Sequence, residues 1–414
     1  MTVTEVAPLA PALQKHTAIS KPGRSPVQYN VSIGYLRAFI TVLVVAHHAV
    51  LAYAPFAPPP PASLVAQPRW WQAFPVSDPQ RWGGFATFVG FNDTFFMSLM
   101  FFLSGLFVWN SLQRKGAAHF LRDRVLRLGL PFALAVTLVA PLAYYPTYLQ
   151  TGQHGLAGFW QQWISLGNWP SGPAWFVWVL LAFDCAAAVL FMLLPRWGAL
   201  LGRLFANASR RPAVFFAILV AASAMVYIPM ELAFNAFRWT EFGPFVFQTS
   251  RILHYFAYFV IAIGLGALGT GRGLLASEGK LARRWPIWAG AALIIFYAET
   301  VMAIAAFTAQ SSPRMWETLA DLGFTVSCAA SSFAFLALFV RFARTSNRIW
   351  NSLRDNAYGM YLVHYAFVSW LQYCILKTQL SAPVKGMAVF LGAVALSWIT
   401  TAALRRIPAV AKVI

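Results

Sequence analysis

Long apolar stretches dominate this chain of 414 residues. Ten of them have about the 20 apolar residues that a helix needs to cross the hydrocarbon core of a bilayer. They lie near 33–54, 86–111, 128–148, 173–194, 212–232, 250–270, 286–308, 320–342, 357–376 and 385–404. Backbone polar groups must be paired within the segment inside a bilayer. The sequence therefore predicts an all-α, polytopic integral membrane protein with about ten transmembrane helices.

The charged residues are few and unevenly placed. They make up 10% of the chain, and Lys and Arg number 31 against 12 Asp and Glu. The basic residues gather in alternate connections, at 112–127, 195–211, 271–284, 341–356 and 405–414. This bias predicts that these connections and both termini are cytoplasmic. We therefore expect the basic residues, which give the chain its net charge of +19, to interact with anionic lipid of the bilayer and not with nucleic acid.

The domain organisation follows from the same pattern. Residues 1–30 are polar and lack the apolar core of a signal peptide, so we expect a flexible cytoplasmic tail. Residues 31–414 are expected to form one transmembrane domain. The three cysteines have no metal-binding spacing, and the sequence shows no phosphate-binding loop, dinucleotide fingerprint or nucleophile elbow. The sequence thus predicts no metal and no bound cofactor.

Arg37 and His48 attract attention because an ionisable residue inside a membrane span is costly. Eleven steps of 100° return within about 20° of the start, so both residues lie on one helix face, about 16 Å apart. One interpretation makes His48 a general base, since histidine titrates near neutrality, and Arg37 the anchor of an anionic group. In the alternative, Arg37 reaches the lipid headgroups and His48 only bonds a neighbouring helix.

Arg124 and Arg127 lie at the entry to the third apolar stretch. They are three residues apart and hence neighbours on a helix. Two guanidinium groups at a membrane surface suit the binding of phosphate. The alternative is that both residues belong to the ordinary cytoplasmic charge that sets topology.

Further polar residues lie within the apolar stretches. Tyr361 and His364 are three apart, so they are predicted to share a hydrogen-bonded face that supports a substrate site or joins two helices. Asp184 and Glu299 lie near the middle of their stretches and need a partner or a proton. The sequence assigns neither carboxylate a role.

Taken together, these motifs resemble the membrane-bound acyltransferase 3 family. Arg37 followed eleven residues later by His48 is similar to the hallmark of its first span. Other segments resemble its later motifs in the same order: 101–105, 120–131, 172–176 and 358–364. The residues at 47–49 and 122–124 are similar to those of the branch with glucan-modifying envelope acyltransferases.

The resemblance implies an O-acyltransferase of the bacterial inner membrane. Such an enzyme moves an acetyl, succinyl or similar group from cytoplasmic acyl-CoA, its co-substrate, to a hydroxyl of an envelope glycan or lipid-linked acceptor. It implies catalytic roles for His48 and Arg37 and donor binding by Arg124 and Arg127. A transporter or flippase with a proton path through His48 and Glu299 is the alternative, although no repeated halves are visible. A membrane scaffold would not require Arg37 and His48 in phase.

Overall fold

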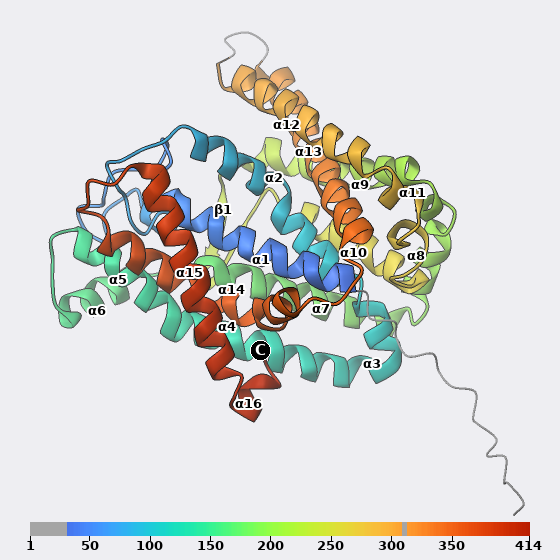
Figure 1. Ribbon diagram of the computed structural model, residues 1–414, viewed down its shortest axis with the longest axis horizontal. Coiled ribbons are helices and arrows are strands. Elements are labelled where there is room, and N and C mark those ends of the chain that lie inside the picture. The colour runs from blue at the N-terminus through green and yellow to red at the C-terminus, as the bar shows by residue number, and fades with distance from the viewer. Residues whose placement is uncertain (1–30, 309–312) are drawn as a thin grey trace, which may run out of the picture.

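The computed structural model describes residues 31–308 and 313–414, which form a bundle of long helices (Figure 1). The predicted tail at 1–30 lies outside these residues. In the described part of the chain, eight helical segments are long and apolar enough to cross a membrane. They are Val31–Leu51, Gly84–Gly105, Val108–Gln150, Gly172–Leu193, Pro212–Phe234, Trp285–Thr308, Arg314–Phe342 and Ala382–Leu404. The predicted all-α, multi-pass membrane fold is confirmed.

The two other predicted stretches are also helical. Helix α10 (Ile252–Leu268) has 17 residues, fewer than the roughly 20 of a typical span. Helix α14 (Arg348–Cys374) has 27 residues, but polar side chains such as Tyr358, His364 and Gln372 lower the mean hydropathy of its apolar part. These two features account for the difference between the ten stretches and the eight segments.

The other elements are labelled in Figure 1 where there is room. The long helices are α1 (Val31–Leu51), α2 (Gly84–Gly105), α3 (Val108–Arg124), α5 (Ala140–Gln150), α7 (Trp175–Leu193), α9 (Pro212–Phe234), α12 (Trp285–Thr308), α13 (Pro313–Phe342) and α15 (Ala382–Leu404). The short helices are α4 (Leu130–Leu134), α6 (Leu156–Ser165), α8 (Trp197–Phe205), α11 (Lys280–Arg283) and α16 (Pro408–Ala411). Turns of 3-10 helix lie at η1 (Trp70–Gln72), η4 (Gly172–Ala174), η5 (Ala208–Arg210) and η6 (Gly273–Leu275).

Helix α1 is enclosed by the bundle, and α12 is not. Helix α1 packs against α2, α13, α14 and α15, and most of its side chains are buried. Helix α12 lies at the edge of the molecule, and Ala292 is the only buried residue along it. Most side chains of α1 therefore contact protein, whereas α12 offers most of its surface to lipid.

Helices α3, α4 and α5 form one helical run that prolines interrupt. The π-helical turns η2 (Val125–Gly129) and η3 (Ala135–Val139) connect them. Pro131 has no N–H, so the carbonyl of Arg127, four residues earlier, loses its regular helical donor. The hydroxyl of Tyr358 on α14 donates to that carbonyl at 2.6 Å. The proline thus creates an attachment point for α14.

The same run repeats this arrangement near its other end. Pro146 cannot donate to the carbonyl of Leu142, and Nε1 of Trp370 on α14 donates to it at 2.9 Å. In the π-helical turn η3, Nε1 of Trp169 donates to the carbonyl of Val136 at 2.8 Å. An unpaired carbonyl in a bilayer is costly. The bonds from Tyr358 and Trp370 therefore hold α14 in register along the run.

The capping loop, residues 52–83, covers one end of α1. Its Asp78 and Lys385 of α15 form an ion pair of 2.7 Å, and both side chains are almost completely buried. The Lys385 ammonium also donates to the carbonyl of Leu376 at 3.0 Å. The hydroxyl of Tyr144 on α5 donates to the carbonyl of Gln72 in this loop at 2.7 Å. The loop is thus fixed to both α5 and α15.

A β-hairpin, which the apolar pattern of the sequence does not predict, follows α9. Strands β1 (Trp239–Phe242) and β2 (Phe245–Gln248) are antiparallel, and Phe242 pairs with Phe245. Gly243 has φ +56°, which suits glycine at the first position of a two-residue hairpin turn. Nε1 of Trp178 on α7 donates to the carbonyl of Val246 at 3.0 Å, which ties the hairpin to the bundle.

Candidate active site

His48 lies in the last turn of α1 and is contacted by α14. Its Nδ1 lies 2.9 Å from the carbonyl oxygen of Val44 and 3.2 Å from Nε2 of His364. Nδ1 of His364 lies 2.7 Å from the carbonyl oxygen of Tyr361. Two residues from the first and last thirds of the chain thus form an imidazole pair, which we call the histidine pair.

The bonding partners assign the tautomers of the histidine pair. A carbonyl oxygen can only accept, so Nδ1 of His364 carries the proton and its Nε2 is the acceptor. Nδ1 of His48 faces this acceptor and the Val44 carbonyl, so it too carries its proton. The lone pair of His48 then resides on Nε2. Within residues 31–308 and 313–414, Nε2 of His48 makes no hydrogen bond. Nε2 is therefore the nitrogen of His48 that can accept a proton.

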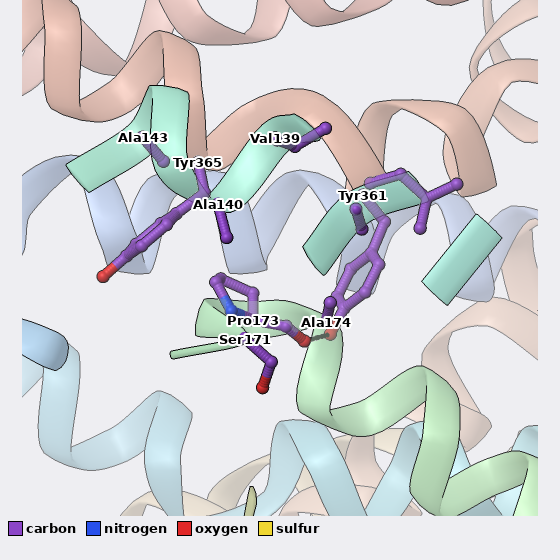
Figure 2. A pocket seen from close by; sticks show the side chains of 10 residues that line it. Val139, Ala140, Ala143, Ser171, Pro173, Ala174, Tyr361 and Tyr365 are labelled. Atoms are coloured by element: carbon purple, nitrogen blue, oxygen red, sulfur yellow. Dashed lines mark hydrogen bonds between the residues drawn. The ribbon is translucent and has the colours of Figure 1, made fainter. Parts of the chain in front are cut away.

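Two tyrosines of α14 flank the histidine pair. The Tyr365 ring meets the His48 ring edge to face, with centroids 5.1 Å apart. The Tyr361 ring centroid lies 5.7 Å from that of His364, and its hydroxyl donates to the carbonyl of Pro173. Figure 2 shows both tyrosines beside a small cavity, with Pro173 across from them. The tyrosines thus join the histidine pair to η4.

This cavity has room for about one water molecule. Small side chains of η3 and α5 form one wall, and Ser171 closes it near η4. Gly172 has φ +52°, and a Cβ there would lie 3.2 Å from the Tyr365 ring. Glycine at this position thus lets the loop approach α14 closely.

His47 is adjacent to His48 but faces another helix. Its ring stacks on Phe96 of α2, with centroids 5.1 Å apart and 29° between the planes. It is buried, and its Nδ1 has no partner among the described residues. The helix phase predicts this divergence, because successive residues of an α-helix are rotated by about 100°. Of the two imidazoles, that of His48 is the one that bonds to α14 within the described residues.

Arg37 is exposed, although its neighbours Leu36 and Ala38 are buried. Helix α1 is continuous between Arg37 and His48, so the two residues share one helix face as predicted from their spacing. The hydroxyl of Thr41 donates to the carbonyl of Arg37 at 3.1 Å. Arg37 therefore lies well away from the histidine pair, near the other end of α1.

The structure gives Arg124 an anionic partner. Its Nε lies 3.1 Å from Oδ2 of Asp184 on α7, and the Asp184 side chain is 1% exposed. The guanidinium also lies over the Phe120 ring, 4.9 Å from its centroid. Asp184, which the sequence left unassigned, is thus the counter-ion of Arg124. Arg127 is exposed in the π-helical turn η2.

Glu299 has no hydrogen bond or ion pair with the histidine pair among the described residues. It lies half-buried on α12, within electrostatic range of the ion pair between Asp93 and Arg251. In that pair, the Arg251 guanidinium lies 2.8 Å from the Asp93 carboxylate. A proton path that joins His48 to Glu299 therefore gains no support from the contacts of either residue.

Sequence reasoning missed two residues of the site. Tyr365 follows His364 directly, and Gln372 on α14 bonds to the backbone of α1 at His48. A signal for Gln372 was present, because a glutamine inside an apolar stretch needs partners. Tyr365 gave no such signal, since tyrosine is common in membrane helices.

These features define a class: a multi-pass membrane protein with an oriented histidine inside its bundle. A family model described as an acyltransferase domain matches residues 30–402, nearly the whole chain. The chain therefore belongs to the acyltransferase 3 family and is an acyltransferase that transfers groups other than amino-acyl groups. No curated protein and no solved structure matches it significantly.

Proposed function

We propose that this acyltransferase moves an acyl group from acyl-CoA to a hydroxyl of an envelope glycan or a related acceptor, with His48 as general base. The observation that carries the proposal is the contact between Nδ1 of His48 and Nε2 of His364, which leaves Nε2 of His48 as the basic nitrogen. A neutral imidazole in this tautomer accepts a proton from a hydroxyl.

The proposed reaction balances without another reagent. The acceptor oxygen attacks the thioester carbon while Nε2 of His48 takes the hydroxyl proton. Collapse of the tetrahedral intermediate breaks the carbon–sulfur bond, and the thiolate of CoA takes the proton back from His48. An O-acyl ester and free CoA leave. Positive charge on His48 is transient, and the bond to His364 stays in place throughout.

The donor is proposed to meet Arg127 and Arg124 at the basic side of the bundle. Arg127 is exposed, and guanidinium groups bind phosphate with charge-assisted hydrogen bonds. Arg124 is held by Asp184, so its guanidinium has a fixed position before a donor binds. Fixed position lowers the ordering cost of binding. We propose that the basic side is cytoplasmic, as the charge bias favours. We also propose, from the family resemblance, that the membrane is the bacterial inner membrane.

The acceptor is proposed to approach from the side of the capping loop. Gln72 of this loop accepts a bond from Tyr144, whose ring lies 5.7 Å from that of Tyr365. Tyr365 in turn contacts His48. The loop is thus close to the histidine pair on the side opposite the basic segments. Trp rings of loops 52–83 and 151–172 suit both stacking on sugars and anchoring in the membrane interface.

One experiment tests this function directly. Purified protein in lipid nanodiscs is given acetyl-CoA or succinyl-CoA and a glycan extract, and free CoA and glycan mass are measured. The expected result is CoA release that depends on the glycan, together with a glycan mass increment equal to one acyl group. CoA release without any acylated glycan would overturn the proposed acceptor class.

A further inference from the structure

Gln372 joins α14 to the backbone of α1 at the catalytic histidine. It is 2% exposed, and its Nε2 lies 3.0 Å from the carbonyl oxygen of His48 and 3.1 Å from that of Ala49. Both partners are carbonyls, so the amide nitrogen, not the amide oxygen, must face them. The two N–H groups of one amide therefore serve two successive carbonyls.

These carbonyls belong to the end of α1. The last four carbonyls of a helix lack regular partners, and in α1 they are those of His48 to Leu51. The turn that follows serves two of them, since Tyr53 N donates to Val50 and Ala54 N to Leu51. Gln372 serves the other two. The end of α1 is thus completed by a side chain of α14.

Helix α14 therefore holds His48 at two places. His364 bonds the imidazole, and Gln372, eight residues later, bonds the main chain of the same residue. Eight residues span about 12 Å along a helix, so the two contacts fix both the position and the tilt of α1 against α14. A bond to the ring alone would not fix the backbone that carries it.

We propose that Gln372 is a positioning residue for His48: by binding the carbonyls of His48 and Ala49, it keeps the His48 imidazole in register with His364. The inference rests on the proposed function of His48. The bonds of the Gln372 amide within the described residues go to the main chain of α1 and not to the imidazole. Loss of its amide lets the last turn of α1 move, and the bond between the two rings lengthens.

The test compares Gln372→Met, which keeps length but removes both donors, with Ser369→Ala. Ser369 is a matched control because it is fully buried on the same helix and donates only to carbonyls of that helix. Gln372→Asn, with an amide one methylene shorter, is a second variant with the same expected direction. Each is studied as full-length protein in nanodiscs.

The first measurement needs no acyl transfer. Diethylpyrocarbonate modifies accessible neutral imidazoles, and peptide mass spectrometry gives the rate at His48. Because Gln372→Met loses two hydrogen bonds, we expect its rate of modification at His48 to change about tenfold. The rate in Ser369→Ala should equal that of the unmodified protein. Equal rates at His48 in Gln372→Met, Gln372→Asn and the control would overturn the inference, whatever the protein catalyses.

The second measurement is acyl transfer. We expect kcat to fall about tenfold in Gln372→Met, with KM for acyl-CoA unchanged and a displaced pH–rate profile. A purely structural loss would lower the rate equally at every pH, and that outcome would refute positioning. If the unmodified protein transfers no acyl group but His48 reactivity still depends on Gln372, the proposed function fails while the contact with His48 is supported.

Discussion

Nε2 of His364 lies 3.2 Å from Nδ1 of His48, although 316 residues separate them in the chain. The contact resembles the arrangement in which one group fixes the tautomer of a catalytic histidine and a different nitrogen does the chemistry. Here the fixing group is itself a histidine, whose own proton is held by the Tyr361 carbonyl. The chain of bonds from Tyr361 to His48 contains no charged residue, so it orients the proposed base without stabilising an imidazolium strongly.

The adjacent histidines provide the first prediction. His48→Ala should lower acyl transfer by roughly 10²–10⁴-fold, because a general base contributes about that much to a rate. His47→Ala should lower it far less, since the His47 ring stacks on Phe96 and makes no bond to α14. Initial rates of acyl transfer at equal protein concentration give both values.

Insertion should survive in both variants, because one polar contact in a membrane bundle contributes only about 0.6–2 kcal/mol. The rate of the unmodified protein should fall as pH drops through the pKa of His48, since an imidazolium cannot accept a proton. An inactive His47→Ala together with an active His48→Ala would show that the wrong ring has been assigned.

The second prediction separates His364 from His48. His364→Ala removes one hydrogen bond, but Nδ1 of His48 keeps the Val44 carbonyl, so the tautomer persists. A single bond between neutral groups is worth about 0.5–1.5 kcal/mol, which predicts a loss of roughly two- to tenfold in kcat. Kinetics of His364→Ala at several pH values check this. A loss as large as that of His48→Ala would mean that His364 itself moves a proton.

The sequence predicted the helices better than their contacts. Apolar length alone located all ten helical stretches, because a bilayer leaves the backbone few alternatives. The helix phase also placed His47 and His48 on different faces of α1. Both predictions depend on local geometry, which a single chain segment determines.

The pairing between distant segments could not be read from the sequence. Asp184 and Arg124 belong to different helices, and nothing in the spacing shows that their helices pack together. Gln372 and His48 are a similar case. Such contacts depend on which of the ten helices pack against one another, and each helix has several polar side chains that could pair.

The third prediction concerns the two arginines proposed to bind the donor. Arg127→Ala should weaken acyl-CoA binding by about tenfold or more without loss of folded protein, because a charge-assisted bond is worth roughly 1.5–3 kcal/mol and Arg127 is exposed. Isothermal titration with a non-hydrolysable acyl-CoA measures this affinity.

Arg124→Ala should lower both donor affinity and protein stability, because it also leaves the buried Asp184 carboxylate without its counter-ion. Its thermal midpoint in detergent should fall, and the double variant Arg124→Ala/Asp184→Asn should recover part of that stability but not donor affinity. Unchanged donor affinity in both arginine variants would contradict donor binding and would show that these residues only set the topology.

The fourth prediction concerns topology. A reporter enzyme that is active only outside the cytoplasm should work when inserted within 151–155, between α5 and α6. It should be inactive after Ile414, since the basic segments are expected to remain inside. Activity after Ile414 would require an odd number of spans and would contradict the proposed orientation.

The last prediction concerns the ion pair that fixes the capping loop. Lys385→Met should destabilise the protein by about 3–5 kcal/mol, because it leaves the Asp78 carboxylate buried and unpaired. The double variant Asp78→Leu/Lys385→Met should be much milder, since well-packed apolar residues often replace a buried pair at little cost. Thermal unfolding in nanodiscs, followed by tryptophan fluorescence, measures both. The carbonyl of Gln72 in this loop accepts a hydrogen bond from Tyr144. Release of the loop should therefore also raise solvent access to the histidine pair. A single variant that is as stable as the double one would show that Asp78 finds another partner or a proton, and that the ion pair does not hold the loop in place.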